Sequence, residues 1–298
     1  MRQRLPFPGS SRMRVLTWLR LAVTSLLAAT LLGGCVTRVV YNQLDWLALW
    51  YVEDYFDLDA AQEAQAKALI ARTLAWHRAT ELPKYATLSK KVLAGIGTPP
   101  DPRFLADRYA EIVELWDELL ARVSPEVAAL LQTLSDEQVE ELFARLVEEN
   151  EELAEDYSGS TAEERRKKQE KAISRAFRRF TGRLNDTQEA LIHRSGAGLH
   201  DLSADWLRRR AAWQQQLRSL LVGRKSDPWF AERLTNLVLN PNQFDTPGYR
   251  QLVVENQQRS FTLVSEVLAS LSAAQAEHLQ KSLTTYARDI DALVRAED

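Results

Sequence analysis

Apolar residues recur at intervals of three and four positions through most of the chain after residue 40. This spacing places side chains on one face of an α-helix. No segment alternates β-branched and polar residues convincingly, and no Asn-Gly or Asp-Gly hairpin turn is present after residue 40. The pattern predicts an all-α protein. The two clearest series are Leu105, Tyr109, Ile112, Trp116, Leu119 and Val123, and Leu279, Leu283, Tyr286, Ile290 and Leu293.

A third series has a period of seven residues and no proline around it. It predicts one helix of about 35 residues, which is about 50 Å long at 1.5 Å per residue. Gly196 and Gly198 lie inside this segment, where each costs about 1 kcal/mol relative to alanine. We therefore expect a kink or a close helix crossing between residues 195 and 198. The series consists of Ile192, Leu199, Trp206, Trp213 and Leu220.

Proline, glycine and capping residues divide the rest of the chain into helices. Breaks are predicted at 95–102, 124–125, 158–161 and 240–247, where these residue types gather. The expected architecture is an elongated bundle of about eight helices. Because no break is long enough for an interdomain linker, residues 58–298 are expected to form a single all-α domain.

One short signature occurs four times: a leucine, a capping residue, two variable residues and a glutamine. The capping residue can accept a bond from an early helical N–H, and the glutamine can bond back to it, which makes a capping box. The simplest interpretation is four well-capped helix starts. The signature also resembles the Leu-Thr-x-x-Gln motif of the Spy and CpxP periplasmic proteins, which bind unfolded clients or a sensor. The copies span 58–62, 134–138, 184–188 and 271–275.

Residues 1–34 are predicted to be a lipoprotein signal peptide, with five arginines and then an apolar run of twelve residues. This run is shorter than the about 20 residues that span a bilayer. Leu32, Gly33, Gly34 and Cys35 resemble a bacterial lipobox, in which the thiol takes a diacylglyceryl group. A plain secretory signal is the alternative, but Cys35 is the single cysteine of the chain. Residues 35–57 would then form a lipidated N-terminus and an aromatic-rich segment.

The predicted anchor decides the expected compartment. Several acyl chains, palmitate among them, anchor firmly because each buried methylene contributes about 0.8 kcal/mol. By resemblance to other lipoproteins, Val36 lacks the aspartate of inner-membrane retention, so we expect the outer membrane, with the body facing the periplasm. That compartment lacks ATP and NAD, and the chain has no glycine-rich phosphate loop. No cofactor is expected.

Composition excludes several other classes. The chain of 298 residues is 45% hydrophobic and 27% charged, which is ordinary for a globular protein. One cysteine excludes a disulfide framework and a cysteine-based metal cluster. Without the five positive charges of the signal peptide, the net charge of −3 becomes −8. Nucleic acid is therefore not expected as a partner.

The aromatic-rich segment allows two interpretations. Trp and Tyr favour the headgroup level of a membrane, so the segment could lie on the bilayer. Trp46 and Trp50 are also four residues apart, which is ordinary spacing for side chains that face a core. Core packing is the simpler interpretation. The aromatic residues are Tyr41, Trp46, Trp50, Tyr51, Tyr55 and Phe56.

The densest cluster of reactive side chains is Trp76, His77, Arg78, Glu81 and Tyr85. His77 and Glu81 are four residues apart on one helical face, so the carboxylate could orient the imidazole. No serine or cysteine nucleophile accompanies them, and the proline after Leu82 is expected to end the helix. We predict no catalytic residue here, and expect either a buried ion pair or a ligand or partner site.

Glu189, His193 and His200 also share a face, but no metal site is predicted from them. The two histidines are seven residues, and so about 10 Å, apart along a helix, which is too far for one ion.

Charge is segregated between residues 135–156, with ten acidic residues, and residues 165–183, with nine basic ones. Two antiparallel helices with complementary faces are the expected arrangement. The alternative is that the basic residues meet anionic lipid headgroups, lipopolysaccharide or an acidic client. The candidate residues are Arg165, Arg166, Lys167, Lys168, Arg175, Arg178 and Arg179.

Several motifs together resemble an uncharacterised family of proteobacterial lipoproteins. They are the run 40–46, Trp76-His-Arg, Glu81-Leu-Pro-Lys-Tyr, and an Arg/Trp-rich segment at 206–213. The resemblance implies a lipid anchor and a helical fold, and brings no function with it.

The expected function is non-enzymatic: the protein would bind other proteins in envelope maintenance, and this binding could be chaperone-like. A structural or adaptor lipoprotein with one dedicated envelope partner is the second hypothesis. A hydrolase acting on cell-envelope material is the third, and the His77 cluster is its only support.

Overall fold

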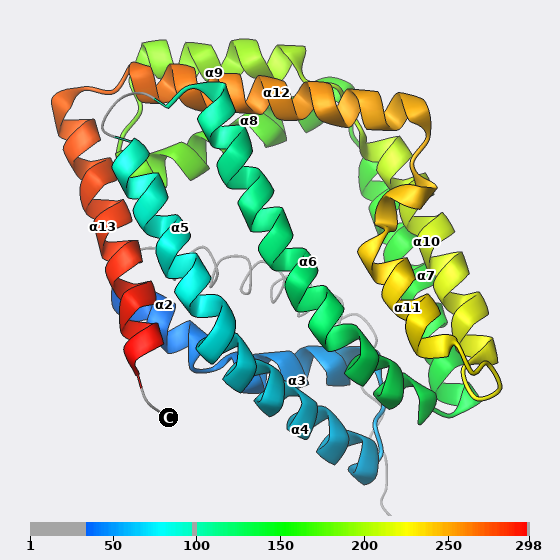
Figure 1. Cartoon of the computed structure of the whole chain (residues 1–298). Helices are drawn as coiled ribbons and strands as arrows, with labels where there is room; N and C mark the ends of the chain where they lie inside the picture. Colours follow the sequence, from blue (N-terminus) through cyan, green and yellow to red (C-terminus); the bar gives the residue numbers. More distant parts are fainter. Residues whose placement is uncertain (1–33, 97–99, 297–298) are drawn as a thin grey trace, which may run out of the picture.

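The computed structural model describes residues 34–96 and 100–296, and all regular secondary structure in these residues is helical. The predicted all-α class is confirmed, but the helices are more numerous than the about eight predicted. They lie along the four sides of an open quadrilateral, which we call the frame (Figure 1).

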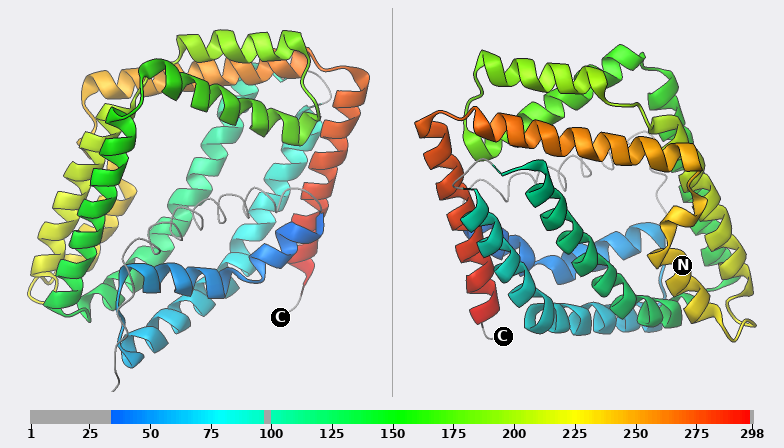
Figure 2. Two further views of the ribbon diagram at one scale, coloured as in Figure 1. Left: turned by 180° about the vertical axis from the view of Figure 1, so that it is seen from behind. Right: turned by 45° about the horizontal axis from the view of Figure 1, so that its top comes forward.

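Each side of the frame consists of helices that pack along one another (Figures 1 and 2). The first side contains α2 (Gly34–Tyr41), α5 (Leu82–Gly95) and α13 (Ala273–Arg295). The second contains α3 (Leu44–Tyr55) and α4 (Ala60–Trp76). The third contains α7 (Asp136–Ser158), α10 (Ser203–Gly223), α11 (Phe230–Leu239) and the short 3-10 helix η2 (Pro241–Phe244). The fourth contains α8 (Ala162–Thr181), α9 (Asp186–Gly198) and α12 (Pro247–Ala269).

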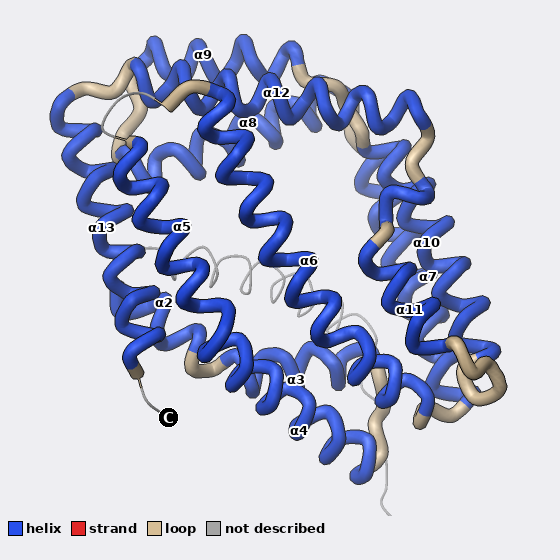
Figure 3. Tube along the Cα trace, in the orientation of Figure 1, coloured by secondary structure: helices blue, strands red, loops and turns tan. Residues whose placement is uncertain are grey.

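The long helix α6 (Pro102–Gln132) crosses the frame obliquely, as the tube in Figure 3 shows. It packs against α12 near one end and against α11 near the other. A break was predicted at 124–125, and this prediction is wrong because α6 continues through Pro125. Proline removes one backbone N–H from the ladder. Just before this proline, the Ser124 hydroxyl donates a hydrogen bond to Leu120 O, four residues back in the same helix, at 2.6 Å.

Buried apolar side chains gather in separate places rather than in one central core. One cluster fills the corner where α6, α7, α10 and α11 meet, with Phe230 and Leu221 fully buried. A second lies between α8, α9 and α12, around Ile192 and Val267. An arrangement with separate cores leaves the middle of α6 without a layer of helices on both sides. No helix in the described part of the chain is both long and apolar enough to cross a membrane.

The predicted single helix of about 35 residues is wrong, because α9 ends at Gly198 and α10 begins at Ser203. The predicted close crossing is confirmed. A Cβ on Gly196 would lie 2.6 Å from Glu170 Cγ, so glycine lets α8 approach α9. Past the end of α9, the backbone N–H of His200 donates to Asn256 Oδ1 at 2.9 Å, and Asn256 Nδ2 donates to His200 O at 2.9 Å. Hydrogen bonds from α12 thus replace those that a continuous helix would have made.

Candidate functional site

The predicted capping boxes are all present, at the starts of α4, α7, α9 and α13. The structure adds a feature that the sequence did not show: the four glutamines form two glutamine pairs. Gln62 pairs with Gln138, and Gln188 pairs with Gln275. The pairs lie at opposite corners of the frame (Figure 1).

Both glutamine pairs have the same pattern of hydrogen bonds. Gln188 Nε2 donates to Gln275 Oε1 at 3.0 Å, and Gln275 Nε2 donates back to Gln188 Oε1 at 2.9 Å. Each amide also donates to a backbone carbonyl two residues before the partner's capping residue, at Ser270 and Arg183. Gln62 and Gln138 repeat this with Thr133 O and Asp57 O. The signature therefore joins helix starts that are distant in sequence, in addition to capping them.

The predicted cluster around His77 is brought together on a π-helical turn, η1 (His77–Glu81). In this turn the Leu82 N–H bonds to His77 O, five residues back. Pro83 has no N–H for a regular helical ladder, and a π turn is one way for a helix to accommodate such a break. The predicted helix end is therefore wrong, since the helix continues from α4 through η1 into α5.

His77 holds α2 against this turn. The Tyr41 hydroxyl lies 2.9 Å from His77 Nδ1, and the Tyr85 ring centroid lies 5.7 Å from the imidazole. Arg78 donates to Asn42 Oδ1 at 3.1 Å and lies over the Tyr41 ring at 5.1 Å. The helix that contains Cys35 is thus fixed to the body by a set of aromatic and polar contacts.

Glu81 is 1% exposed and pairs with Lys84, whose Nζ lies 2.9 Å from Glu81 Oε1. Its Oε2 has no hydrogen-bond partner among the described residues. The carboxylate raises the pKa of His77 only as a secondary influence, because desolvation is the larger cause and lowers it. Glu81 therefore makes its ion pair with Lys84 and not with His77, and a ligand or partner site at this cluster stays a prediction.

The burial of His77 predicts a pH dependence of stability. Its pKa lies below the ordinary value of 6.5 because burial disfavours the imidazolium. The unfolded chain then binds a proton more readily, so this contribution is complete above the unfolded pKa and is lost as pH falls towards the folded one. In His77→Gln, whose side-chain oxygen can still accept from Tyr41, the fall in Tm from about pH 7.5 to about pH 5.5 should be smaller than in the wild type.

The matched control for this experiment is His278→Gln, because His278 is exposed and makes no hydrogen bond or ion pair with the other described residues. It should keep the pH dependence of the wild type. An unchanged pH dependence in His77→Gln would contradict the role of His77.

The candidate basic residues are mostly paired within the protein. Arg165 Nε lies 2.8 Å from Asp201, Arg166 lies 2.7 Å from Glu170, and Arg178 pairs with Glu189. Lys167 pairs with Glu163 at 2.8 Å, and Lys168 with Asp156 at 3.1 Å. Arg175 Nε donates to Lys171 O at 3.4 Å. Burial lowers the pKa of Arg179, whose Nε and one Nη have no hydrogen-bond partner in the described part of the chain.

The predicted antiparallel pairing of the acidic and basic helices is not found. The acidic helix α7 packs along α10, and α8 packs along α9 and α13. Arginines of α10 neutralise α7, because Arg210 Nη2 lies 2.9 Å from Glu149 and Arg218 pairs with Glu140. The charge of α7 correctly indicated a positively charged neighbouring helix, but this neighbour is α10 and not α8.

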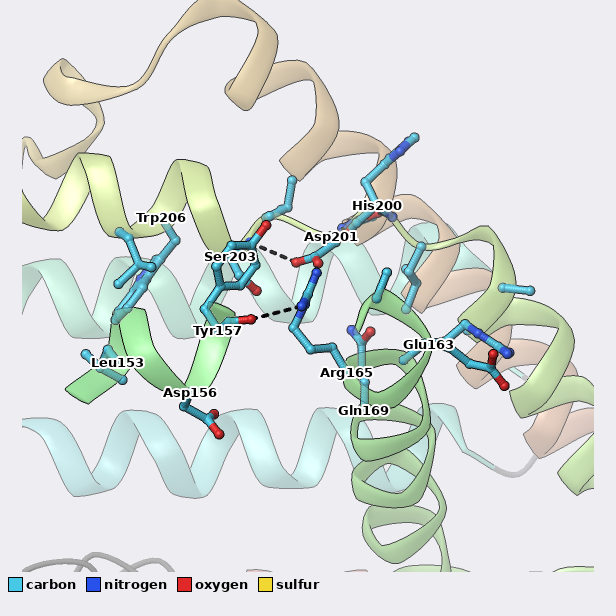
Figure 4. A pocket seen from close by; sticks show the side chains of 18 of the residues that line it. Leu153, Asp156, Tyr157, Glu163, Arg165, Gln169, His200, Asp201, Ser203 and Trp206 are labelled. Carbon is cyan, nitrogen blue, oxygen red and sulfur yellow. Dashed lines mark hydrogen bonds and ion pairs between the residues drawn. The ribbon is translucent and has the colours of Figure 1, made fainter. Parts of the chain in front are cut away.

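A pocket of about 860 Å³ lies where α7, α8, α10 and α12 approach one another (Figure 4). The Arg165 guanidinium lies 4.2 Å from the Tyr157 ring centroid and donates to Tyr157 O at 3.1 Å. His200 Nε2 lies 2.7 Å from Glu255 Oε2. Arg165 also pairs with Asp201, so these charged groups stabilise the corner itself.

Glu189, His193 and His200, which share a helical face in the sequence, have separate contacts. Glu189 accepts from Ser174 and Arg178, His193 lies 3.1 Å from Glu170, and His200 contacts Glu255. Within residues 34–96 and 100–296, no group of three His, Cys, Asp or Glu side chains is placed to hold a metal ion.

The middle of α6 carries exposed apolar side chains. Tyr109, Ile112, Val113 and Trp116 are 48%, 48%, 38% and 54% exposed, and we call these four residues the α6 face. The sequence showed most of this series, but its periodicity could not show whether another element covers it. The Tyr109 ring packs edge-on against Phe261 of α12, with centroids 5.9 Å apart.

Of the lipobox residues, Leu32 and Gly33 lie outside the described residues, and Gly34 and Cys35 begin α2. The aromatic-rich segment divides: Trp46 and Tyr51 are 60% and 58% exposed, whereas Trp50, Tyr55 and Phe56 are half-buried.

These features define an all-α protein with an exposed apolar helix across an open frame. The chain belongs to a family of unknown function, DUF6279, whose family model matches residues 54–250. No curated protein and no solved structure shows significant similarity to the chain.

Proposed function

We propose that this protein binds other polypeptides in the bacterial envelope, as a chaperone-like lipoprotein of the outer membrane that faces the periplasm. The α6 face carries this proposal. Its four residues are spaced so that they share one side of the helix. Neighbouring exposed apolar side chains of this kind are typical of sites where proteins bind partners.

The contacts of α6 indicate that the α6 face is a preorganised binding surface. α6 is held by α12 near one end and by α11 near the other, so its central turns are fixed in space. Little ordering is then required on binding, which preserves affinity.

The charges beside the α6 face indicate the kind of segment that fits. Glu114 and Asp117 are exposed on the same turns of the helix. The nearby Glu111 pairs with Lys91, whereas Glu114 and Asp117 make no ion pair of 4.0 Å or less with any other described residue. A client segment that presents apolar side chains together with lysine or arginine would satisfy both features.

The test measures light scattering of a reduced, unfolding client with and without the protein in its Cys35→Ser form. The wild-type surface should suppress scattering at equimolar ratio or below. Ile112→Gln combined with Trp116→Gln should raise the concentration for half suppression by about fivefold or more, because it removes apolar contact area. High salt should weaken suppression, because it screens the charges of Glu114 and Asp117.

The matched control replaces exposed apolar residues elsewhere, with Val222→Gln and Trp229→Gln, which are 69% and 60% exposed in the wild type. This control should behave as the wild type. An equal loss in both variants would contradict the assignment to α6. Absence of suppression by the wild type would contradict the chaperone-like role, and cross-linking from residue 112 in cells would then test for one dedicated partner.

A further inference from the structure

The helix α3 is predominantly apolar around its circumference, with Asp45, Glu53 and Asp54 between the apolar residues, and none of its residues is buried. Nine of its twelve residues, LDWLALWYVEDY, are aliphatic or aromatic. In the described structure it packs along α4, and at its C-terminal end Tyr55 packs against the core at α7 and donates to Glu149 Oε1 at 2.8 Å. Trp46 and Tyr51 are 60% and 58% exposed, and Val39 on the preceding helix α2 is also 60% exposed.

A helix with apolar residues on most of its circumference is normally covered there by a protein core or by lipid. The described residues supply a core at the C-terminal end of α3, where Tyr55 packs, and none around Trp46 and Tyr51. Twelve residues extend about 18 Å, which is shorter than the about 30 Å of a bilayer's hydrocarbon region. Such a helix can lie in the interface, where Trp and Tyr are favoured, but cannot span the membrane.

The position of α3 in the chain identifies the surface that covers it. Leu44 lies nine residues after Cys35, the residue proposed to carry the acyl chains. From Cys35 to Tyr41 the helix α2 extends about 9 Å, and a turn of two residues leads directly into α3, so an anchored Cys35 keeps α3 close to the headgroups. The contact between Tyr41 and His77 fixes α2 to the body, which limits how far α3 can turn away.

We propose that α3, with Trp46, Tyr51 and Val39, lies in the lipid interface of the membrane that holds the anchor. This proposal rests on the proposed lipidation of Cys35, and not on the binding role of α6. The frame would then stand with its α3–α4 side on the membrane, and with α8, α9 and α12 on the far side (Figure 2).

The charge of this segment decides how the contact should respond to lipid composition. Residues 36–57 contain one basic residue, Arg38, and four acidic ones. Attraction to anionic lipids therefore does not contribute, and burial of apolar side chains is the driving force. Binding should be as strong on neutral phosphatidylcholine vesicles as on vesicles with phosphatidylglycerol, and insensitive to salt.

The first experiment places the full lipidated protein in vesicles of phosphatidylcholine with brominated acyl chains, which quench nearby tryptophans. The wild type should be quenched, and Trp46→Phe should lose about half of the quenched emission, since Trp50 is the other tryptophan of α3. Trp206→Phe is the matched control, because Trp206 is 39% exposed and lies at the pocket beside α8 and α12, on the far side of the frame. It should keep the full quenching.

The second experiment uses the Cys35→Ser protein, so that the acyl chains do not dominate binding. Its partition onto neutral vesicles should fall about tenfold or more in Trp46→Gln combined with Tyr51→Gln. Equal quenching in Trp46→Phe and the wild type would overturn the proposal. So would binding that requires anionic lipid and disappears in salt, because the basic residues of α8 would then be responsible.

A photo-crosslinker at position 46 shows whether α3 contacts lipid, a second copy of the chain or another protein. Capture of lipid supports the proposal, whereas capture of a second copy or of another protein in place of lipid overturns it. The Ile112→Gln and Trp116→Gln variant should keep normal quenching, and the Trp46 variants should keep client suppression. Failure of the membrane contact and failure of client binding are therefore separate results.

Discussion

Replacing Gln188 by leucine should lower the free energy of unfolding by about 3 kcal/mol, because one amide serves several buried groups. Gln188 is fully buried. Its Oε1 accepts from Asn185 N at 3.0 Å, and its Nε2 donates to Ser270 O at 3.2 Å. Removing the amide leaves these two backbone groups without this partner and removes the two bonds between Gln188 and Gln275, while Gln275 keeps its bonds to Arg183 O and Ser272 N. The measurement is the midpoint of urea unfolding, with the dependence on denaturant unchanged.

The double variant Gln188→Leu with Gln275→Leu distinguishes a true pair from two independent caps. Each single change already removes both bonds between the two amides, so the two losses should not add, and the coupling should be about 1 kcal/mol or more. Gln215→Leu, at an exposed position of α10, should change stability by less than about 0.5 kcal/mol. Strict additivity would show that the paired amides contribute nothing to one another.

Replacing Arg224 by methionine should lower the free energy of unfolding by about 3 kcal/mol or more, because buried carbonyl groups would lose their hydrogen-bond donor. Arg224 is 2% exposed, and its guanidinium donates to Leu134 O at 2.7 Å and to Leu221 O at 2.7 Å. The bond to Leu134 O joins the end of α10 to the start of α7, and the bond to Leu221 O caps the end of α10 itself. Lysine should not rescue the loss, because its ammonium lacks the planar fork of donors that reaches both carbonyls.

Two variants check that the effect arises from the buried end of Arg224. Its ion-pair partner Asp136 has an 81% exposed side chain, so Asp136→Asn should cost much less. Arg233→Met removes a 60% exposed arginine that pairs with Asp227, and should stay within about 0.5 kcal/mol of the wild type. A loss in Asp136→Asn equal to that in Arg224→Met would assign the effect to the ion pair.

Local signals in the sequence predicted local structure well. The helical class followed from spacing, and the four capping boxes followed from residue type at fixed offsets. The close approach at Gly196 followed from a glycine inside a helical pattern. Each of these depends on neighbours within a few residues, which a single sequence shows directly.

Features that depend on distant residues could not be predicted in the same way. The break at residues 199–202 is stabilised by Asn256 of α12, which is 56 residues away from His200. The glutamine pairs join positions 76 and 87 residues apart. The exposure of the α6 face depends on the absence of a covering layer among the described helices. Periodicity shows which side chains share a face and does not show what lies opposite.

The spacing of the glutamine pairs has a consequence for how the chain folds. They close loops of 76 and 87 residues, and the entropic cost of closure rises only with the logarithm of loop length, so the two costs differ by about 0.1 kcal/mol. The entropy of loop closure therefore does not favour either glutamine pair to form first. Synthesis is directional, however, and the first loop is complete once residue 138 has emerged. One corner of the frame can therefore close while the second half is still being made, and that half then folds against a finished template.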